Sequence, residues 1–534
     1  MIERRDFLKL TVGGIAMGQI THGFASERKN APAWNLTSGA QAEEAGAPAA
    51  APSGFILSEA RPFEPALVTE AARALARQSY KAVAQPLPDV FANLGIDQYN
   101  TITLRPHSGL WIDNNLGFAI EPLHRGSIFS NPMDINIVEQ GEQRRLIYNQ
   151  TRYAFGSLPI PDNIGDIGFS GFRVLVPNDG QSFVTLATFQ GATFFRAIAR
   201  GQNEGTTARA LSIKTADPRG EEFPMIRAVW IETPTLAENT LTLHALIDSQ
   251  SVAGAYRFTI HPNEATIIDT ECTLFARNNV DHFGLATMAG SHLLAPVGQR
   301  HIDDLRPQVS EVGGLAMLNG RGEWLWRPVA NRATLQISSF LDEKPHGFGF
   351  LQRDRDFDDF QDDFQHWEKR PSLWIEPIGE WGPGAMQLIE IPSDSEINDN
   401  ILAYWRPQQP LTPGSESFFA YRQFWCWKPP VSPPLAVTTL SRQGHGSAPH
   451  RRRFLVQFTG PMLGDQKKLQ DIKPIVTAST GSIYELHAFP VPERQSYRVL
   501  FELDTGTETT SELRLVLEAS SVAISETWLY RWTP

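Results

Sequence analysis

The sequence predicts an all-β protein, in which a large N-terminal antiparallel β-sandwich precedes a smaller C-terminal immunoglobulin-like β-sandwich. From about Gln98 onward, short stretches such as "TITLRP", "FVTLATF", "TLTLHALI" and "FFAYRQFWCW" alternate with Gly, Pro, Asn and Asp, a pattern typical of strands joined by turns. Helical periodicity is scarce in the same region. With 534 residues, the chain is too long for one ordinary core, which favours two domains.

The N-terminus reads "MIERRDFLKLTVGGIAMGQITHGFASERKN". Arg4 and Arg5 precede a modestly apolar segment, and the triplet "GFA" ending at Ala25 supplies the small-x-small pattern that a signal peptidase cuts after. We interpret residues 1–25 as a twin-arginine signal peptide, which predicts export of the folded chain to a periplasm. The alternative interpretation is a short apolar helix with a basic flank.

Residues 26–53 contain "APAWNLTSGAQAEEAGAPAAAPS", an Ala, Pro and Gly-rich stretch with little apolar surface to order it. We expect a disordered tether there. Pro65 then opens a predicted helix in which Leu67, Ala71 and Leu75 recur on one face.

The domain boundary is predicted from prolines. Residues 54–427 carry the strand pattern of the large sandwich, and "KPPVSPP" over 428–434 places four prolines where no central strand can form. Residues 435–534 follow with "RFLVQF", "YRVLFEL", "ELRLVLE" and "TWLYRW" at regular spacing. That size and rhythm are typical of an immunoglobulin-like sandwich.

Charge and composition restrict the partners. The formal net charge of -12 disfavours nucleic acid, whose binding depends on clustered Lys and Arg. No apolar run beyond the N-terminus is long enough to span a bilayer. Cys272 and Cys426 are the two cysteines, and they are compatible either with one disulfide or with plain core positions. No cysteine or histidine spacing predicts a metal site, and no nucleotide or cofactor motif occurs.

Aromatic pairs form one group of candidate binding residues. Trp324 and Trp326 in "GEWLWRP" lie two apart and therefore point to one face of a strand, and Trp425 and Trp427 repeat the spacing. Flat sugar faces stack on such rings. Large aromatics also dominate protein cores, and the core interpretation is the commoner one.

An acidic stretch, "DRDFDDFQDDFQHWEKRPSLW", holds Asp354, Asp356, Asp358, Asp359, Asp362 and Asp363. A calcium loop and a solvated acidic loop both fit this composition. The glycine that an EF-hand requires is missing, so we expect no metal there.

The stretch "EIPSDSEINDNILAYWRP" places Glu396 and Asp399 three residues apart, directly before a predicted strand. On a helical turn the two carboxylates would share a face and repel each other, which raises one pKa and keeps that group protonated for acid catalysis. The alternative is an Asn-Asp-Asn turn with a solvent-facing acid.

Several long blocks in order resemble one family. The blocks are "GFSGFRVLVP", "FRAIARGQ", "EEFPMIRAVWIE", "LIDSQSVAGAYRF", "GEWLWRP", "GFGFLQRDRDF", "RPSLWIEPIGEWGPGAMQLIEIP" and "NDNILAYWRP". The chain resembles, over roughly residues 87–534, the osmoregulated periplasmic glucan biosynthesis proteins G and D. Its twin-arginine signal is similar to the D type. The resemblance implies a large β-sandwich joined to an immunoglobulin-like domain.

The resemblance also implies an activity. D-type proteins are similar to inverting β-1,2-glucanases, which are glycoside hydrolases, and related members act as transglycosylases that transfer the glucan chain. No cofactor is implied. Carried over by position, the general acid falls on Asp399, its supporting carboxylate on Glu396, and the base on Glu311 of "PQVSEVGGL", where the family pattern has Asp. The longer Glu311 side chain shifts the carboxylate by about one bond, which disturbs water positioning.

The expected glucan contacts follow from the same blocks, and they are Trp324, Trp326, Arg353, Tyr404 and Trp405. Two other functions remain beside the enzyme: a non-catalytic factor that binds nascent glucan chains, and a structural scaffold that works through the immunoglobulin-like domain. A functional link to a membrane glucan synthase is also expected. The basic segment Ser441–Arg453, "SRQGHGSAPHRRR", is interpreted either as an ordinary surface loop or as a segment that reaches the cleft of a second subunit in a homodimer.

Overall fold

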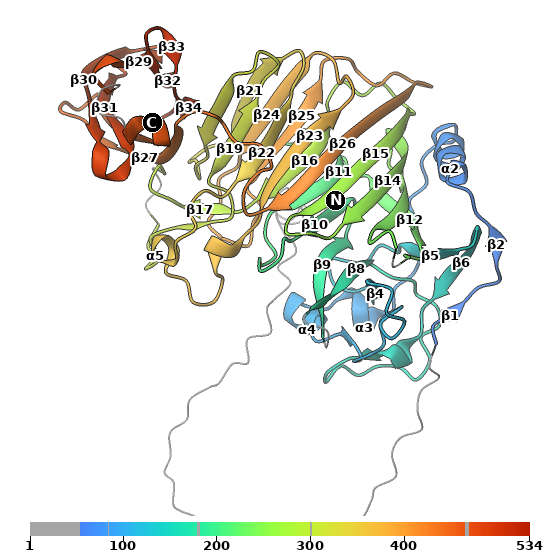
Figure 1. Cartoon of the computed structure of the whole chain (residues 1–534). Coiled ribbons are helices and arrows are strands. Elements are labelled where there is room, and N and C mark those ends of the chain that lie inside the picture. The colour runs from blue at the N-terminus through green and yellow to red at the C-terminus, as the bar shows by residue number, and fades with distance from the viewer. Residues whose placement is uncertain (1–53, 84, 179–181, 236, 299–301, 465–468) are drawn as a thin grey trace, which may run out of the picture.

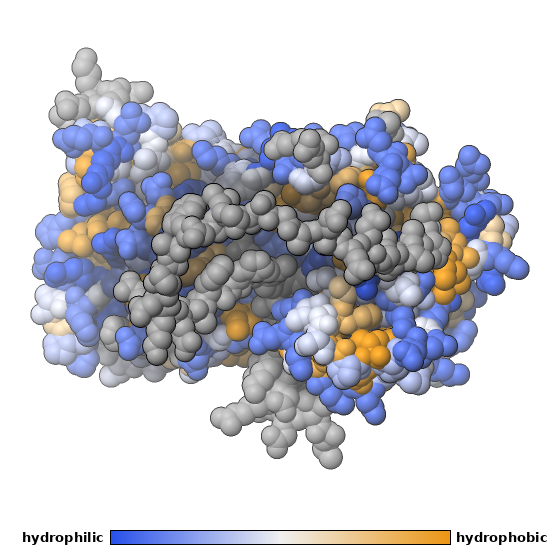
Figure 2. Space-filling view, turned by 90° about the horizontal axis from the view of Figure 1, so that it is seen from below, coloured by the Kyte–Doolittle hydropathy of each residue, from blue (hydrophilic) through white to orange (hydrophobic). Residues whose placement is uncertain are grey.

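The computed structural model describes residues 54–534 except 84, 179–181, 236, 299–301 and 465–468. The predicted signal peptide with Arg4, Arg5 and Ala25, and the predicted tether over 26–53, lie outside the described residues. The described chain is nearly all β, as the strand pattern predicts, and its strands form two large packed sheets and a smaller unit (Figure 1). Figure 2 shows one face of the molecule as mostly hydrophilic, with hydrophobic residues in small groups.

The first large sheet has nine antiparallel strands in the order β21-β24-β25-β16-β11-β10-β9-β8-β4. Its strands are β4 (Ala119–Leu123), β8 (Gly171–Asn178), β9 (Ser182–Gln190), β10 (Phe194–Ala197), β11 (Thr207–Ile213), β16 (Phe283–Gly290), β21 (Gln336–Asp342), β24 (Gly384–Glu390) and β25 (Ile401–Pro407). The central strands are buried along their whole length, for example β11 and β16. Both faces of these strands are buried, which explains continuous apolar runs such as "GLATMAG".

The second large sheet runs in the order β6-β5-β12-β13-β14-β15-β26-β23-β22-β19-β20. Its pairings are antiparallel except for the parallel pair β5 and β12. Its strands are β5 (Asp134–Glu139), β6 (Glu142–Ile147), β12 (Met225–Glu232), β13 (Leu241–Asp248), β14 (Val252–His261), β15 (Thr266–Ala276), β19 (Gly314–Leu318), β20 (Trp324–Pro328), β22 (Gly347–Leu351), β23 (Ser372–Ile378) and β26 (Glu416–Cys426).

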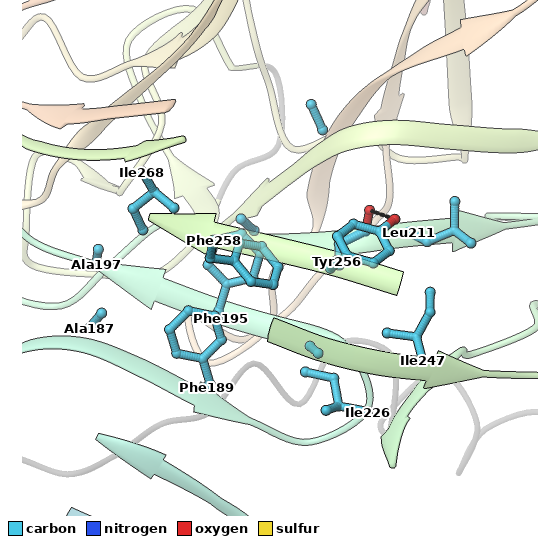
Figure 3. Packing of buried hydrophobic residues seen from close by; sticks show 14 of the residues in the cluster. Ala187, Phe189, Phe195, Ala197, Leu211, Ile226, Ile247, Tyr256, Phe258 and Ile268 are labelled. Carbon is cyan, nitrogen blue, oxygen red and sulfur yellow. Dashed lines mark hydrogen bonds between the residues drawn. The ribbon is translucent and has the colours of Figure 1, made fainter. Parts of the chain in front are cut away.

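The main core lies between these two sheets (Figure 3). Phe189 and Phe195 of the nine-stranded sheet meet Phe258 on β14, with ring centroids 5.5 and 5.4 Å away. The Tyr256 hydroxyl on β14 donates to the carbonyl of Ala210 on β11 over 2.8 Å. Aromatic rings from facing sheets thus interdigitate, as in a β-sandwich.

The C-terminal part contains a four-stranded sheet in the order β27-β28-β31-β30 and a second sheet built from β29, β32, β33 and β34. These strands are β27 (Val437–His445), β28 (Arg451–Thr459), β29 (Ile472–Ala478), β30 (Ser482–Val491), β31 (Ser496–Asp504), β32 (Ser511–Ala519), β33 (Val522–Ala523) and β34 (Thr527–Trp532). Residues 428–434 form no strand or helix. The domain boundary predicted there stays a prediction.

One pairing that the strand pattern did not predict joins the two parts. Strand β34 lies parallel to β20, with Leu325 opposite Thr527 and Trp326 opposite Trp528. The large sheet therefore continues into the C-terminal part, which lies at one end of the large sandwich (Figure 1). Tertiary hydrogen bonding, as well as the proline segment, connects the two.

Helices and short strands make up the remainder. They are α2 (Ala66–Ala76), α3 (Asp89–Ala92), α4 (Ile96–Asn100), α5 (Phe357–Phe360), η1 (Gln150–Arg152), η2 (Trp367–Lys369), η3 (Pro461–Gly464), η4 (Leu469–Asp471), η5 (Pro492–Arg494), β1 (Ile56–Leu57), β2 (Arg61–Pro62), β3 (Thr103–Leu104), β7 (Tyr153–Ala154), β17 (His292–Leu294) and β18 (Val309–Ser310). No described helix has both the length and the hydropathy needed to cross a bilayer.

The predicted helix after Pro65 is present as α2, but its buried face is rotated by about one residue. Val68 and Ala72 are buried, whereas Leu67 is 48% exposed. Val68 and Ala72 pack with apolar side chains of the second large sheet, so the helix covers the outer face of that sheet.

Candidate active site

Strand register brings Asp399 together with residues from distant segments. Asp399 lies just before β25, whose first residue, Ile401, pairs with Gly290 at the end of β16. The neighbouring residue of β16, Ala289, pairs with Thr207 at the start of β11. Asp399, Thr207 and the residues that follow Gly290 therefore lie at one end of the nine-stranded sheet.

Asp399 is a buried acid with another acid beside it. Its side chain is 6% exposed. Burial raises the pKa of Asp399 to about 6, and the negative charge of Glu311 adds to the rise. Arg196, Arg209 and a hydrogen bond with Thr207 act in the opposite direction. A carboxyl group with such a pKa keeps its proton to higher pH than an ordinary aspartate, as a general acid requires.

Glu311 is held in place by the backbone next to it. It follows β18, its N–H donates to the carbonyl of Ser291 over 2.8 Å, and the Ser291 N–H donates to Glu311 Oε2 over 3.2 Å. A guanidinium nitrogen of Arg370 lies 4.0 Å from Glu311 Oε1. The side chain is 12% exposed. The carboxylate is therefore held by its neighbours and still partly accessible to solvent.

A histidine and an asparagine connect the segments that carry the two acids. The His292 N–H donates to Asn400 Oδ1 over 2.8 Å, and Asn400 Nδ2 donates to the carbonyls of His292 and Ile391 over 3.1 and 3.0 Å. His292 Nδ1 lies 2.8 Å from the carbonyl oxygen of Val312, the residue after Glu311. Both acid-bearing segments are thus fixed to residue 292, which the sequence analysis did not single out.

The two arginines near Asp399 have carboxylate partners of their own. Arg209 forms an ion pair of 2.7 Å with Glu221, and both side chains are buried. Arg196 lies 3.6 Å from Glu204. Because these guanidinium groups are shared with other acids, their positive charge does not cancel the effects of burial and of Glu311 on the pKa of Asp399.

The structure contradicts the helical-spacing argument for Glu396, whereas its role as supporting carboxylate stays a prediction. Its Oε2 lies 2.5 Å from an Arg306 guanidinium nitrogen, which also binds Asp304. Glu396 is not among the largest causes of the raised pKa of Asp399, and residues 396–397 form a turn rather than a helix. The three-residue spacing therefore does not place the two carboxylates as a repelling pair, and Glu311 takes that position.

Tyr404 and Trp405 lie in the interior rather than on a sugar-binding surface. The Tyr404 hydroxyl donates to Gln387 Oε1 over 2.8 Å and lies 2.7 Å from His282 Nε2. Trp405 is 1% exposed and belongs to the main core. We correct the expectation that they stack on glucan, because β25 is covered on both faces.

Trp324 and Trp326 face the same side of β20, as predicted, and both are buried. Trp324 stacks on Trp374, with ring centroids 5.7 Å apart. The Arg353 guanidinium lies over the Trp326 ring at 3.6 Å and binds Glu526 through two nitrogens, over 2.6 and 2.9 Å. One face of each ring is thus covered by a protein group, and the role of Trp324, Trp326 and Arg353 as glucan contacts stays a prediction.

The acidic stretch makes specific contacts. Asp362 accepts hydrogen bonds from Arg306 over 2.7 Å and from the Trp367 indole over 2.9 Å. Within the described residues, no group of three or more His, Cys, Asp or Glu is placed to hold a metal ion. Cys272 and Cys426 are buried with free thiols, which supports the core alternative over the disulfide.

The segment Ser441–Arg453 is mostly part of a hairpin rather than a loop. Strands β27 and β28 pair through it, for example at Gly444 and Arg453. Arg453 and Ser447 both bind the buried carboxylate of Glu502, Arg453 over 2.6 Å and the Ser447 hydroxyl over 2.7 Å. The basic segment is therefore anchored to its own domain.

The fold and the site define a β-sandwich protein with a buried acid pair at one end of its central sheet. Residues 63–532 match the family model described as "Periplasmic glucan biosynthesis protein, MdoG". The chain belongs to this family of periplasmic glucan biosynthesis proteins.

Curated relatives agree with that assignment. A Vibrio cholerae protein named "Glucans biosynthesis protein G" is 43% identical over 479 residues, which cover 88% of this chain and 87% of the relative. A protein of the same name from Rhodopseudomonas palustris is 40% identical over 472 residues, covering 88% of this chain and 93% of the relative. The predicted similarity to the D type stays a prediction.

Proposed function

We propose that the protein acts on β-1,2-glucan as an inverting glycoside hydrolase or transglycosylase in periplasmic glucan biosynthesis. The observation that supports this proposal is the buried Asp399 carboxyl, whose pKa is raised by burial and by Glu311. An inverting enzyme needs one carboxylic acid to protonate the leaving oxygen and one carboxylate to activate the nucleophile. Asp399 and Glu311 suit these two roles.

In the proposed mechanism, protonated Asp399 donates its proton to the interglucose oxygen as the bond to the anomeric carbon breaks. Glu311 accepts a proton from a water molecule that attacks the opposite face of the sugar, directly or through intervening waters and hydroxyls. If a glucan hydroxyl takes the place of water, the same two groups carry out transglycosylation. Inversion at the anomeric carbon follows because one displacement occurs without a covalent intermediate.

Incubation with purified linear β-1,2-glucan tests the proposal. Proton NMR of the first products should show the inverted anomer, and mass spectrometry should show shorter chains for hydrolysis or new linkages for transfer. Retention of the anomer would contradict the mechanism. Full activity in Asp399→Asn would show that Asp399 is not the general acid. The matched control, Glu380→Gln at an exposed acid, should leave turnover unchanged.

The second candidate is a non-catalytic factor that binds nascent glucan. It is favoured by the low exposure of Asp399, 6%, and by the arginines near it, because these features also suit a carboxylate that only organises a binding surface. Equilibrium binding separates the candidates. A binding factor has no turnover in the wild-type chain, whereas the enzyme loses turnover and keeps affinity in Asp399→Asn.

The proposal also includes export by the twin-arginine pathway. It further includes assembly as a homodimer and a functional link to a membrane glucan synthase. The family description, which includes the word periplasmic, supports the compartment. Replacing Arg4 and Arg5 with Lys should leave unprocessed protein in the cytoplasm. Light scattering of the mature chain measures the subunit count.

A further inference from the structure

A cavity of about 670 Å³ lies between the large sandwich and the C-terminal part, beside α5 and β17. One wall comes from the acidic stretch around Asp354 and from Trp326, and the other comes from β27, β28, η5 and β31. Neither Asp399 nor Glu311 lines it. The volume falls in the range of small-molecule sites, and the function proposed above makes no use of this cavity.

Direct contacts fix the two walls relative to each other. Arg353 binds Glu526 and also donates to the carbonyl of Thr438 over 2.8 Å. The Thr438 N–H donates to Glu526 over 2.7 Å. On another side, Gln443 Nε2 donates to the carbonyl of Val297 over 2.7 Å. With the walls held in this way, a ligand binds without first ordering the site, which reduces the entropic cost of binding.

The large-sandwich wall offers acceptors. Asp354, Asp356 and Asp359 line it. Asp354 receives one side-chain hydrogen bond, from Gln308 over 3.2 Å. Burial raises the pKa of Asp354, which indicates a carboxyl group without full compensation from the protein. Its remaining lone pairs can accept hydrogen bonds from a ligand.

The opposite wall offers donors. Arg442, Arg494 and Arg498 line it. Arg498 donates to Gln457 over 2.8 Å. Within the part of the chain that the structure describes, the side chains of Arg442 and Arg494 make no hydrogen bond or ion pair. Two guanidinium groups are therefore available to a ligand at this wall.

The combination of the walls selects the chemistry of the ligand. Three carboxylates disfavour an anion, and the four guanidinium groups that line the cavity, Arg353 included, disfavour a cation. A neutral hydroxyl-rich molecule satisfies both walls, because each sugar hydroxyl donates to a carboxylate and accepts from a guanidinium. We propose that this cavity is a second saccharide site, which holds a part of the glucan chain that does not react at Asp399. The identity of the saccharide as β-1,2-glucan rests on the function proposed above.

Binding at such a second site adds affinity for long chains only. A β-1,2-linked glucose disaccharide occupies one site at a time. A long chain, in contrast, occupies the site at Asp399 and the cavity together. Loss of the donor wall should therefore weaken the binding of long chains selectively. Losing two charged hydrogen bonds corresponds to about tenfold or more in Kd.

The test is calorimetric binding of long linear β-1,2-glucan and of the disaccharide to the mature chain, in the Asp399→Asn background so that no turnover occurs. Arg442→Ala combined with Arg494→Ala should raise the Kd of the long glucan by about tenfold or more and leave the Kd of the disaccharide unchanged. Arg144→Ala, on the exposed side of β6, is the matched control and should change neither Kd. Asp354→Asn is an independent variant of the acceptor wall and should also weaken the long glucan.

Unchanged Kd values in both cavity variants, with melting curves like that of the parent chain, would overturn the inference. Equal weakening of the long glucan and the disaccharide would also overturn it, because the effect would then not be confined to a second site. Failure of the proposed function is a separate result. If the wild-type chain does not cleave or transfer glucan but long-chain binding depends on Arg442 and Arg494, the second site stands without the enzyme.

Discussion

Asn400 Oδ1 accepts the backbone N–H of His292 over 2.8 Å, and Asn400 Nδ2 donates back to the carbonyl of His292 over 3.1 Å. This reciprocal pair fixes the chain beside Asp399 to the chain beside Glu311. The Asn400 side chain is 1% exposed, so no solvent can replace its hydrogen bonds.

Asn400→Ala should reduce both stability and turnover. The substitution leaves buried backbone groups of His292 and Ile391 without partners, which should lower the free energy of unfolding by about 2–4 kcal/mol. A displaced Asp399 should lower kcat with little change in KM. Urea unfolding and steady-state kinetics measure the two effects. Asn398→Ala, which removes one hydrogen bond to Ser393, is the control, and a wild-type kcat in Asn400→Ala would show that the pair does not position the acid.

Asp399→Asn should remove turnover and increase stability at neutral pH. The pKa of Asp399 in the folded chain, about 6, exceeds its unfolded value of about 3.9. Folding is therefore favoured by protonated Asp399 below pH 4, and that contribution is lost as pH rises through about 6. The asparagine variant should be more stable by roughly 1–3 kcal/mol at pH 7, and the difference should shrink at pH 4. Urea unfolding at both pH values measures the difference in stability. A variant that is less stable than the wild type at pH 7 would contradict the raised pKa of Asp399.

Glu311→Gln should lower the pKa of Asp399. The negative charge of Glu311 is the second cause of the raised value after burial, and an uncharged glutamine removes it. Carbon NMR titration of the Asp399 carboxyl measures the shift directly, without relying on activity. Glu396→Gln is the comparison, because Glu396 is paired with Arg306 and should leave the titration of Asp399 unchanged. An equal shift of the Asp399 pKa in both variants would show that Glu396 influences Asp399 as much as Glu311 does.

The sequence predicted the class of fold because strand periodicity and turn residues are local signals. It did not predict which faces are covered. The resemblance placed Tyr404 and Trp405 among the glucan contacts, yet both lie in the interior. The parallel pairing of β20 with β34 joins segments about two hundred residues apart, a contact for which local patterns carry no information.

The acid pair illustrates the same limit. The resemblance supplied Asp399, Glu311 and Glu396, whereas the local spacing indicated only Glu396 as the partner of Asp399. Helical spacing is informative only if the segment is helical, and here it is a turn that ends at a strand. The long-range partner depends on the register of β11, β16 and β25, which is fixed by burial over the whole sheet.

Glu390→Gln should destabilise the folded chain strongly. Glu390 is 1% exposed; its carboxylate lies 3.1 Å from Arg327 and 3.3 Å from Arg332, and it accepts the Ala330 N–H over 2.8 Å. Arg332 also donates to the Tyr530 hydroxyl over 3.1 Å, which connects this carboxylate to β34. Loss of its charge leaves two buried guanidinium groups uncompensated, which should cost about 3–5 kcal/mol.

The pH dependence of that effect has a definite sign. Burial alone would raise the pKa of Glu390, but Arg327 and Arg332 outweigh it and hold the pKa below its usual value. The stabilisation is therefore present above the unfolded pKa of about 4.3 and is lost as pH falls through the lower folded value. Urea unfolding of Glu390→Gln should show a smaller deficit at pH 3 than at pH 7, whereas Glu380→Gln, at an 87% exposed side chain, should change stability little at either pH. A deficit that is constant with pH would show that lost packing, rather than lost charge, destabilises the variant.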